Sequence, residues 1–125
     1  MISYKLNTKT GILETTFKGN ISMQDIIDYI SALAQDKTLP QKLKVLSDAS
    51  KAKLAGEPEL DELMRIVETN KKAVALKDGT YDAFIISGSV ETALGQIYMD
   101  LSKTEKYMFK VFSTKKAALE WLNKF

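Results

Sequence analysis

The sequence has 125 residues, a length that fits one domain. It is 45% hydrophobic and 27% charged with a net charge of +2, which is typical of a globular protein and lacks the basic excess that points to nucleic acid. It contains neither cysteine nor histidine, which excludes disulfides, zinc–thiolate sites, thiolate nucleophiles and every catalytic triad that needs an imidazole.

The chain opens with the pattern of a β-hairpin followed by a helix. Residues 2–6 and 12–17 favour strands, and the turn residues between them include Gly11, which tolerates a positive φ. Ser22 is a good N-cap for a helix whose apolar residues recur at helical spacing. Pro40 cannot continue that helix, so it marks the connection to the next strand.

The middle of the chain predicts a short strand, a loop and a second helix. The apolar run 43–46 is the strand, and residues 51–57 are the expected loop. Pro58 suits the first helical position, and the acidic residues around it favour the positive end of the helix dipole. Asp78 and Gly79 form a stop signal after this helix.

The last third predicts two strands, each followed by a helix. Residues 81–86 lack polar alternation at their end, as expected for a strand that is covered on both faces. Ser89 is the expected cap of the next helix, residues 107–112 form a fifth strand, and Thr114 caps the last helix. Four residues of that helix are expected to face the core: Ala117, Ala118, Trp121 and Leu122.

The predicted order is therefore β-β-α-β-α-β-α-β-α within a single domain over residues 1–125. Strands that are separated by helices become parallel neighbours joined by right-handed crossovers, and the opening hairpin adds an antiparallel edge. The expected fold class is α/β, a five-stranded mixed sheet carrying four helices. No apolar run approaches the roughly 18 residues of a membrane-spanning helix, so we expect a cytoplasmic protein that does not span a membrane.

Three segments carry a resemblance to a known family. They resemble the SpoIIAA-like group of the STAS family of anti-sigma-factor antagonists. The closing stretch 111–122 carries the resemblance best, with its Phe, polar cap and Ala-x-x-Trp-Leu ending. The other two segments are the strand end 45–48 and the segment 95–101 followed by the strand 106–112. The resemblance implies a compact, non-enzymatic regulatory or protein-binding module without a cofactor. Better-studied STAS proteins are switched by phosphorylation of a serine in an Asp-Ser-Ser-Gly type stretch. Here the corresponding stretch is Asp48-Ala49-Ser50, with no second serine and no glycine before Gly56.

Two groups of residues are candidate sites, because ligands of open α/β sheets gather beyond the carboxyl ends of the strands. The first comprises Asp48, Ser50, Lys51 and Lys53, a partner-contact loop in which Ser50 is the candidate phosphate acceptor. Simple turn bonding by Asp48 and Ser50 explains the same residues. The second is Ser87-Gly88-Ser89, whose free amides at a helix start favour an anion or another ligand. Here ordinary capping by Ser89 is the alternative.

The function that we expect is binding rather than catalysis, with a protein partner of unknown identity and either a monomeric or a homodimeric state. The alternative is a carrier or sensor of a small apolar or lipid-like ligand held between the sheet and the helices. Six residues could line an apolar pocket, although their spacing also suits core packing: Met64, Met99, Met108, Tyr98, Tyr107 and Trp121. No nucleic acid, metal or cofactor is expected.

Overall fold

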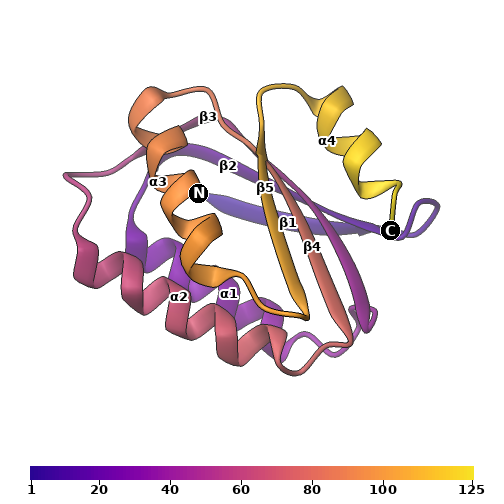
Figure 1. Ribbon diagram of the computed structural model, residues 1–125. Helices are drawn as coiled ribbons and strands as arrows, with labels where there is room; N and C mark the ends of the chain where they lie inside the picture. The colour runs from indigo at the N-terminus through magenta and orange to yellow at the C-terminus, as the bar shows by residue number, and fades with distance from the viewer.

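The computed structural model describes residues 1–125 and shows one mixed sheet with four helices (Figure 1). Its strands are β1 (Ile2–Asn7), β2 (Ile12–Ile21), β3 (Lys42–Leu54), β4 (Gly79–Ile85) and β5 (Tyr107–Phe112). Its helices are α1 (Met23–Gln35), α2 (Leu60–Val74), α3 (Ser89–Ser102) and α4 (Lys115–Leu122). The order of elements and the α/β class are as predicted.

The strands lie in the sheet in the order in which they occur along the chain, β1-β2-β3-β4-β5. β1 and β2 are antiparallel, while every later neighbouring pair is parallel. Each parallel pair is joined by a helix, as the crossover rule requires. The sheet therefore has one antiparallel edge and a parallel body, as expected.

The two faces of the sheet are covered unequally (Figure 1). On one face only α4 packs, and its Ala118, Trp121 and Leu122 are buried against Ile12, Leu46 and neighbouring strand residues. On the other face lie α1, α2 and α3, whose apolar stripes meet one another in a second cluster around Met23, Ile30 and Ile66. This three-helix face holds the site described below.

The third strand is longer than predicted. β3 continues to Leu54, so the expected loop 51–57 is mostly strand, because residues 51–54 pair with residues 18–21 of β2. The pairing register shifts between Thr16 and Lys18, and Gly19 takes a φ of +72° just beyond this irregularity. Polar and small residues on both strands hid this extension: residues 51–54 alternate between exposed and half-buried positions, whereas residues 18–20 of β2 are all exposed.

Two predicted helix starts were wrong. α2 begins at Leu60 with Glu59 as N-cap, so Pro58 precedes the helix rather than opening it. α3 has Gly88, not Ser89, as its N-cap, and no side chain caps it. The other two predicted caps are confirmed: Ser22 forms a capping box with Asp25, and the hydroxyl of Thr114 accepts a hydrogen bond from the amide of Ala117.

Candidate ligand-binding cavity

A cavity of about 520 Å³ lies between the three-helix face of the sheet and helices α1, α2 and α3. Of its 35 lining residues, 25 are hydrophobic. Sites for small molecules are usually concave, mostly apolar and roughly 300–1,000 Å³ in volume. The cavity therefore has the size and the chemical character of a ligand site.

The packing around the cavity is open. Ile26 of α1, Phe84 of β4, Leu94 of α3 and Phe109 of β5 all line the cavity and are only partly buried, although they occupy the interior layer between sheet and helices. Protein interiors normally pack as densely as organic crystals, which would bury such side chains fully. The apolar surface of these residues is thus available to a bound molecule.

One carboxyl group stands in this apolar lining, that of Asp82. Alternate residues of β4 face the cavity, so Thr80, Asp82 and Phe84 line it while Tyr81 and Ala83 pack toward α4. The Oδ1 atom of Asp82 accepts a hydrogen bond of 2.9 Å from the hydroxyl of Ser47 on β3. No other protein group donates to this carboxyl group.

Burial raises the pKa of Asp82 to about 7, and the hydrogen bond from Ser47 opposes only part of this rise. No cationic side chain acts on the pKa of Asp82. The group therefore titrates near neutral pH, far from the usual range of an aspartate. A strongly shifted carboxyl inside a cavity is a recognised sign of a functional site.

Further hydroxyl groups extend from Asp82 across the sheet. Thr15 of β2 pairs with Ser47 in the register of the two strands, and both are fully buried. The Oγ1 atom of Thr15 lies 2.7 Å from the hydroxyl of Tyr29 on α1. Burial raises the pKa of Tyr29 well above its ordinary value, so this phenol stays neutral. The polar strip is therefore uncharged apart from Asp82.

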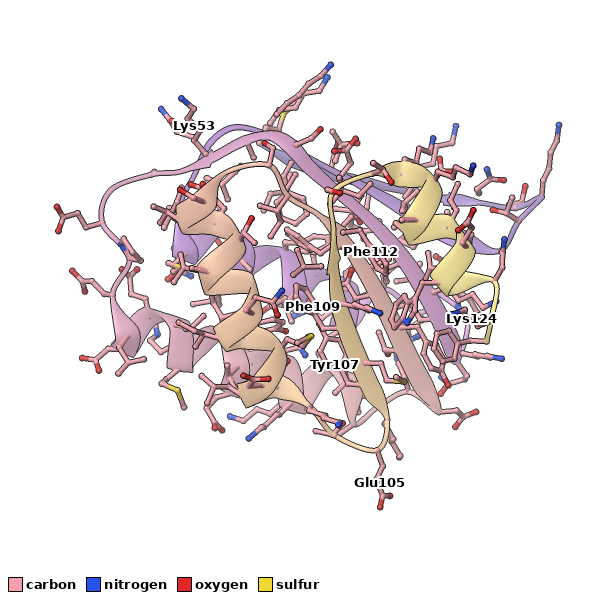
Figure 2. The ribbon with its side chains drawn as sticks, turned by 45° about the horizontal axis from the view of Figure 1, so that its top comes forward. Lys53, Glu105, Tyr107, Phe109, Phe112 and Lys124 are labelled. Atoms are coloured by element: carbon pink, nitrogen blue, oxygen red, sulfur yellow. The ribbon has the colours of Figure 1, made fainter.

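Aromatic rings form a continuous series beside this strip. The rings of Phe17 and Phe84 have centroids 5.1 Å apart, and those of Phe84 and Phe109 are 5.4 Å apart. The ring of Tyr98 meets that of Phe109 edge-on at 4.8 Å. Figure 2 shows Tyr107 and Phe109 on β5 beside α3, whereas Phe112 lies on the side of α4. Asp82 is the strand partner of Phe109, so its carboxyl group stands among these rings.

Two buried polar groups of the lining have no hydrogen-bond partner. They are Nδ2 of Asn70 on α2 and Oγ1 of Thr80 on β4, and their residues are 7% and 6% exposed. Buried polar groups in proteins are nearly always paired, because an unpaired one costs about 1–3 kcal/mol. Each of them offers a bond to a molecule in the cavity.

The lining reaches exposed side chains at two ends of the sheet. Near the start of β3 it includes Lys37, Gln41 and Leu76, and near the end of β3 it includes Lys53, which is labelled in Figure 2. Glu91 of α3 also lines the cavity near this second end. The lining therefore extends to the protein surface at both of these ends.

The first predicted site occupies a strand rather than a loop. Asp48, Ser50, Lys51 and Lys53 all belong to β3, which corrects the expected loop. Asp48 accepts hydrogen bonds from both the amide and the hydroxyl of Ser50, at 3.0 and 2.6 Å, and the hydroxyl bond lowers the pKa of Asp48. Only Lys53 among them lines the cavity. This bonding is local, as in the simpler alternative, but it occurs within a strand and not in a turn; phosphorylation of Ser50 stays a prediction.

The second predicted site, Ser87-Gly88-Ser89, lies at the start of α3. The hydroxyl of Ser87 donates to the backbone oxygen of Ser50, which connects the two predicted sites. The carboxylate of Glu91 folds back over Gly88 so closely that a Cβ atom on residue 88 would collide with it. This carboxylate also accepts a hydrogen bond from the backbone amide of Leu54. A negative charge thus already stands at this helix start, where an anion would bind. Anion binding here stays a prediction.

The six predicted pocket residues divide between the two faces. Tyr98 and Tyr107 line the cavity, while Trp121 is buried under α4 on the opposite face. Met64 and Met108 are 37% and 40% exposed and, like Met99, do not line the cavity. Asp82 is not among the predicted residues, although a single acid at the start of an apolar parallel strand is a signal that the sequence carries.

The acidic residues form no group of three or more that could hold a metal ion. No helix combines the length and the apolar character needed to cross a bilayer.

Comparison with known proteins identifies a fold and a family. No curated protein matches the sequence. A solved structure of an uncharacterised protein from Shewanella loihica PV-4, of the DUF3478 family and with a SpoIIAA-like fold, is similar with a TM-score of 0.62 and 19% identity, over 97% of this chain and 93% of that chain. The predicted SpoIIAA-like fold is thereby confirmed. A family model described as a domain of unknown function, DUF7793, matches residues 6–125, and the chain therefore belongs to the DUF7793 family.

Proposed function

We propose that this domain is a non-enzymatic binding module that holds a small, largely apolar molecule between its sheet and helices α1–α3. The observation that carries the proposal is the cavity of about 520 Å³, whose lining is mostly hydrophobic and includes interior side chains that are only partly buried. An apolar ligand removes that surface from water, which stabilises the complex by roughly 25 cal/mol per Å².

The polar groups in the cavity support binding over catalysis. Asp82 has the pKa of a general base, and Ser47 is its hydrogen-bond partner. However, Ser47 is 0% exposed, so a substrate cannot reach its hydroxyl group as it would reach a nucleophile. The chain has no histidine or cysteine to take that role instead.

The proposal is tested with uncharged apolar probes, for which we choose 1-octanol and the fluorescent N-phenyl-1-naphthylamine. We expect saturable binding of one naphthylamine per chain, displacement by octanol, and a rise in unfolding temperature with octanol. A ligand at 100 times its Kd stabilises the folded state by about 2.7 kcal/mol, which a thermal melt resolves. Absence of saturable binding and of any thermal shift, for both probes up to their solubility, would sink the proposal.

The regulatory role implied by the resemblance is a second candidate, and the outward face of α3 favours it. Val90, Ile97 and Leu101 are 51%, 46% and 37% exposed and share one side of the helix, while Leu94 and Tyr98 of the same helix line the cavity. A protein partner with an apolar contact face would bind there. The test is the recovery of a partner from an extract of the source cell with the wild-type protein and with the folded variants Ile97→Lys and Leu101→Lys. Equal recovery by all three proteins would contradict this role.

A further inference from the structure

We infer that the molecule held in the cavity carries a protonated amine, which pairs with the carboxylate of Asp82 inside a wall of aromatic rings. The inference rests on the proposed binding function and names the chemical class of its ligand. Two independent features lead to it, the missing counter-charge of Asp82 and the aromatic surroundings of that residue.

The first feature is a carboxyl group without a cation. Asp82 faces the phenols of Tyr29 on α1, Tyr98 on α3 and Tyr107 on β5, whose pKa values are all raised by burial and which stay neutral. α2 contributes Asn70 to the lining, and β3 contributes Ser47 as the donor to Asp82.

The charged side chains of the lining do not compensate Asp82. They are Asp36, Lys37, Lys53, Lys77 and Glu91, and none of them forms a hydrogen bond or an ion pair with Asp82, whose carboxyl group accepts only from Ser47. An unpaired charge in a protein interior is strongly unfavourable. A ligand that brings a cation supplies the charge that the protein lacks.

The second feature is the ring series from Phe17 through Phe84 and Phe109 to Tyr98. Consecutive centroids lie 4.8–5.4 Å apart, and Asp82 shares the face of β4 with Phe84 and is paired with Phe109. Aromatic faces attract organic cations within about 6 Å, and aromatic cages are a known way to recognise ammonium groups. A carboxylate combined with such rings favours an ammonium over other polar heads.

Hydrogen bonding in the cavity agrees with this choice. An ammonium group has three donors and no acceptor. Asp82 offers the oxygen that Ser47 does not bind, and the unpartnered Oγ1 of Thr80 lies two residues away on the same face of β4. A carboxylic acid ligand would instead place a like charge beside Asp82, which is unfavourable for both groups.

The test compares three ligands with the same eight-carbon chain, octylamine, 1-octanol and octanoate, by calorimetric titration at pH 6 and pH 8. The amine is charged at both pH values, while Asp82, with a pKa of about 7, changes from about one-tenth to about nine-tenths ionised. We expect octylamine to bind best of the three at pH 8 and roughly tenfold more weakly at pH 6, while the affinity for octanol stays constant.

Two variants locate the effect. Asp82→Asn keeps the shape of the side chain and should lose the preference for the amine and its pH dependence, while octanol still binds. Asp100→Asn is the matched control, because it makes the same change at an exposed carboxylate of α3 outside the cavity lining, and it should bind octylamine as wild type does. If Asp82→Asn does not fold, the pH series of the wild-type protein still decides.

The outcomes separate the inference from the proposed function. Binding of octanol and octylamine with equal affinity and no pH dependence would overturn the amine while leaving the cavity function intact. Failure of all three ligands to bind would overturn both. A preference for octanoate would also overturn the inference, because the charged head of the ligand would then pair with a lysine of the lining and not with Asp82.

Discussion

At the scale of single residues, the titration of Asp82 can be measured without interference from histidine. The chain has no histidine, so no imidazole titrates between pH 5 and 7.5. Asp25, Asp36 and Asp48 have lowered pKa values and are already ionised above pH 5. Asp82 is therefore the group expected to dominate changes in stability within this window.

We expect the unliganded protein to become less stable as the pH rises from 5 to 7.5. The pKa of Asp82 in the folded state, about 7, lies above the value of about 4 in an unfolded chain, so the folded state binds more protons in between. Stability is then highest at low pH within the window and decreases by about 2.5 kcal/mol by pH 7.5. Urea unfolding at several pH values measures this decrease.

Asp82→Asn is the control for this titration, since an amide keeps the hydrogen bond from Ser47 without carrying a charge. Its stability should change little over the same window and should exceed that of the wild-type protein at pH 7.5. A wild-type protein whose stability is flat or rises from pH 5 to 7.5 would show that Asp82 is solvated and ionised throughout.

The sequence contains the signal for Asp82 but not for its environment. The neighbours of Asp82 in the chain, Tyr81 and Ala83, face α4, and only the alternation of β4 places Asp82 on the other side. Whether that side is solid core or cavity depends on how far the helices stand from the sheet. Apolar spacing in a helix tells which face is buried but not the distance to what buries it.

At the scale of elements, the N-termini of the helices differ in how they are stabilised, and this difference is testable. Ser22 and Asp25 satisfy each other's backbone amides in a capping box at the start of α1. Ser89, in contrast, is exposed at the first position of α3, and its side chain makes no hydrogen bond. We expect Ser22→Ala to lower the free energy of unfolding by about 1 kcal/mol, and Ser89→Ala to change it by less than about 0.5 kcal/mol.

Chemical unfolding of both variants checks this difference. Equal losses from the two substitutions, or a larger loss from Ser89→Ala, would mean that Ser89 caps α3 in solution. Far-ultraviolet circular dichroism of the folded variants shows whether either helix is lost outright.

The elements themselves were largely predictable, and the errors have physical causes. Residues 107–112 formed the expected strand because β-branched and aromatic residues dominate it. β3 was predicted too short because the lysines after Ser50 and the nearby Gly56 and Pro58 favour a loop, although the half-buried Ala52 and Leu54 alternate with exposed lysines as in a strand. The start of α3 was misassigned because a glycine and a serine both suit an N-cap, and the sequence alone does not choose between Gly88 and Ser89.

At the scale of the whole molecule, alternation of strands and helices was enough to predict the topology. Each parallel strand pair needs a crossover, and the crossover rule leaves few arrangements for this order. With this strand order the same rule places the three crossover helices α1–α3 on one face, whereas α4 is not a crossover and covers the other face. The rule does not set the distance between these helices and the sheet, and that distance leaves the cavity. The candidate site is thus a property of packing between elements that lie far apart in the sequence.

If the cavity is the functional site, filling it with a larger side chain should weaken ligand binding without lowering the stability of the protein. Ala73 of α2 and Ala49 of β3 line the cavity from opposite walls, and both are partly buried. A phenylalanine at either position buries more apolar surface, so we expect Ala73→Phe and Ala49→Phe to unfold at the same or a higher temperature than the wild-type protein when empty. Each should bind octanol at least about tenfold more weakly, since the ring occupies the space of the ligand.

The matched control is Ala93→Phe, which places the same ring on the exposed side of α3 outside the cavity lining. It should bind octanol with wild-type affinity, because it leaves the cavity volume unchanged. Thermal melts and octanol titrations on the three variants give both quantities in one series. Full octanol affinity in both Ala73→Phe and Ala49→Phe would show that octanol binds outside the cavity. The two rings enter the cavity from opposite walls, so no position inside it would be free in both variants.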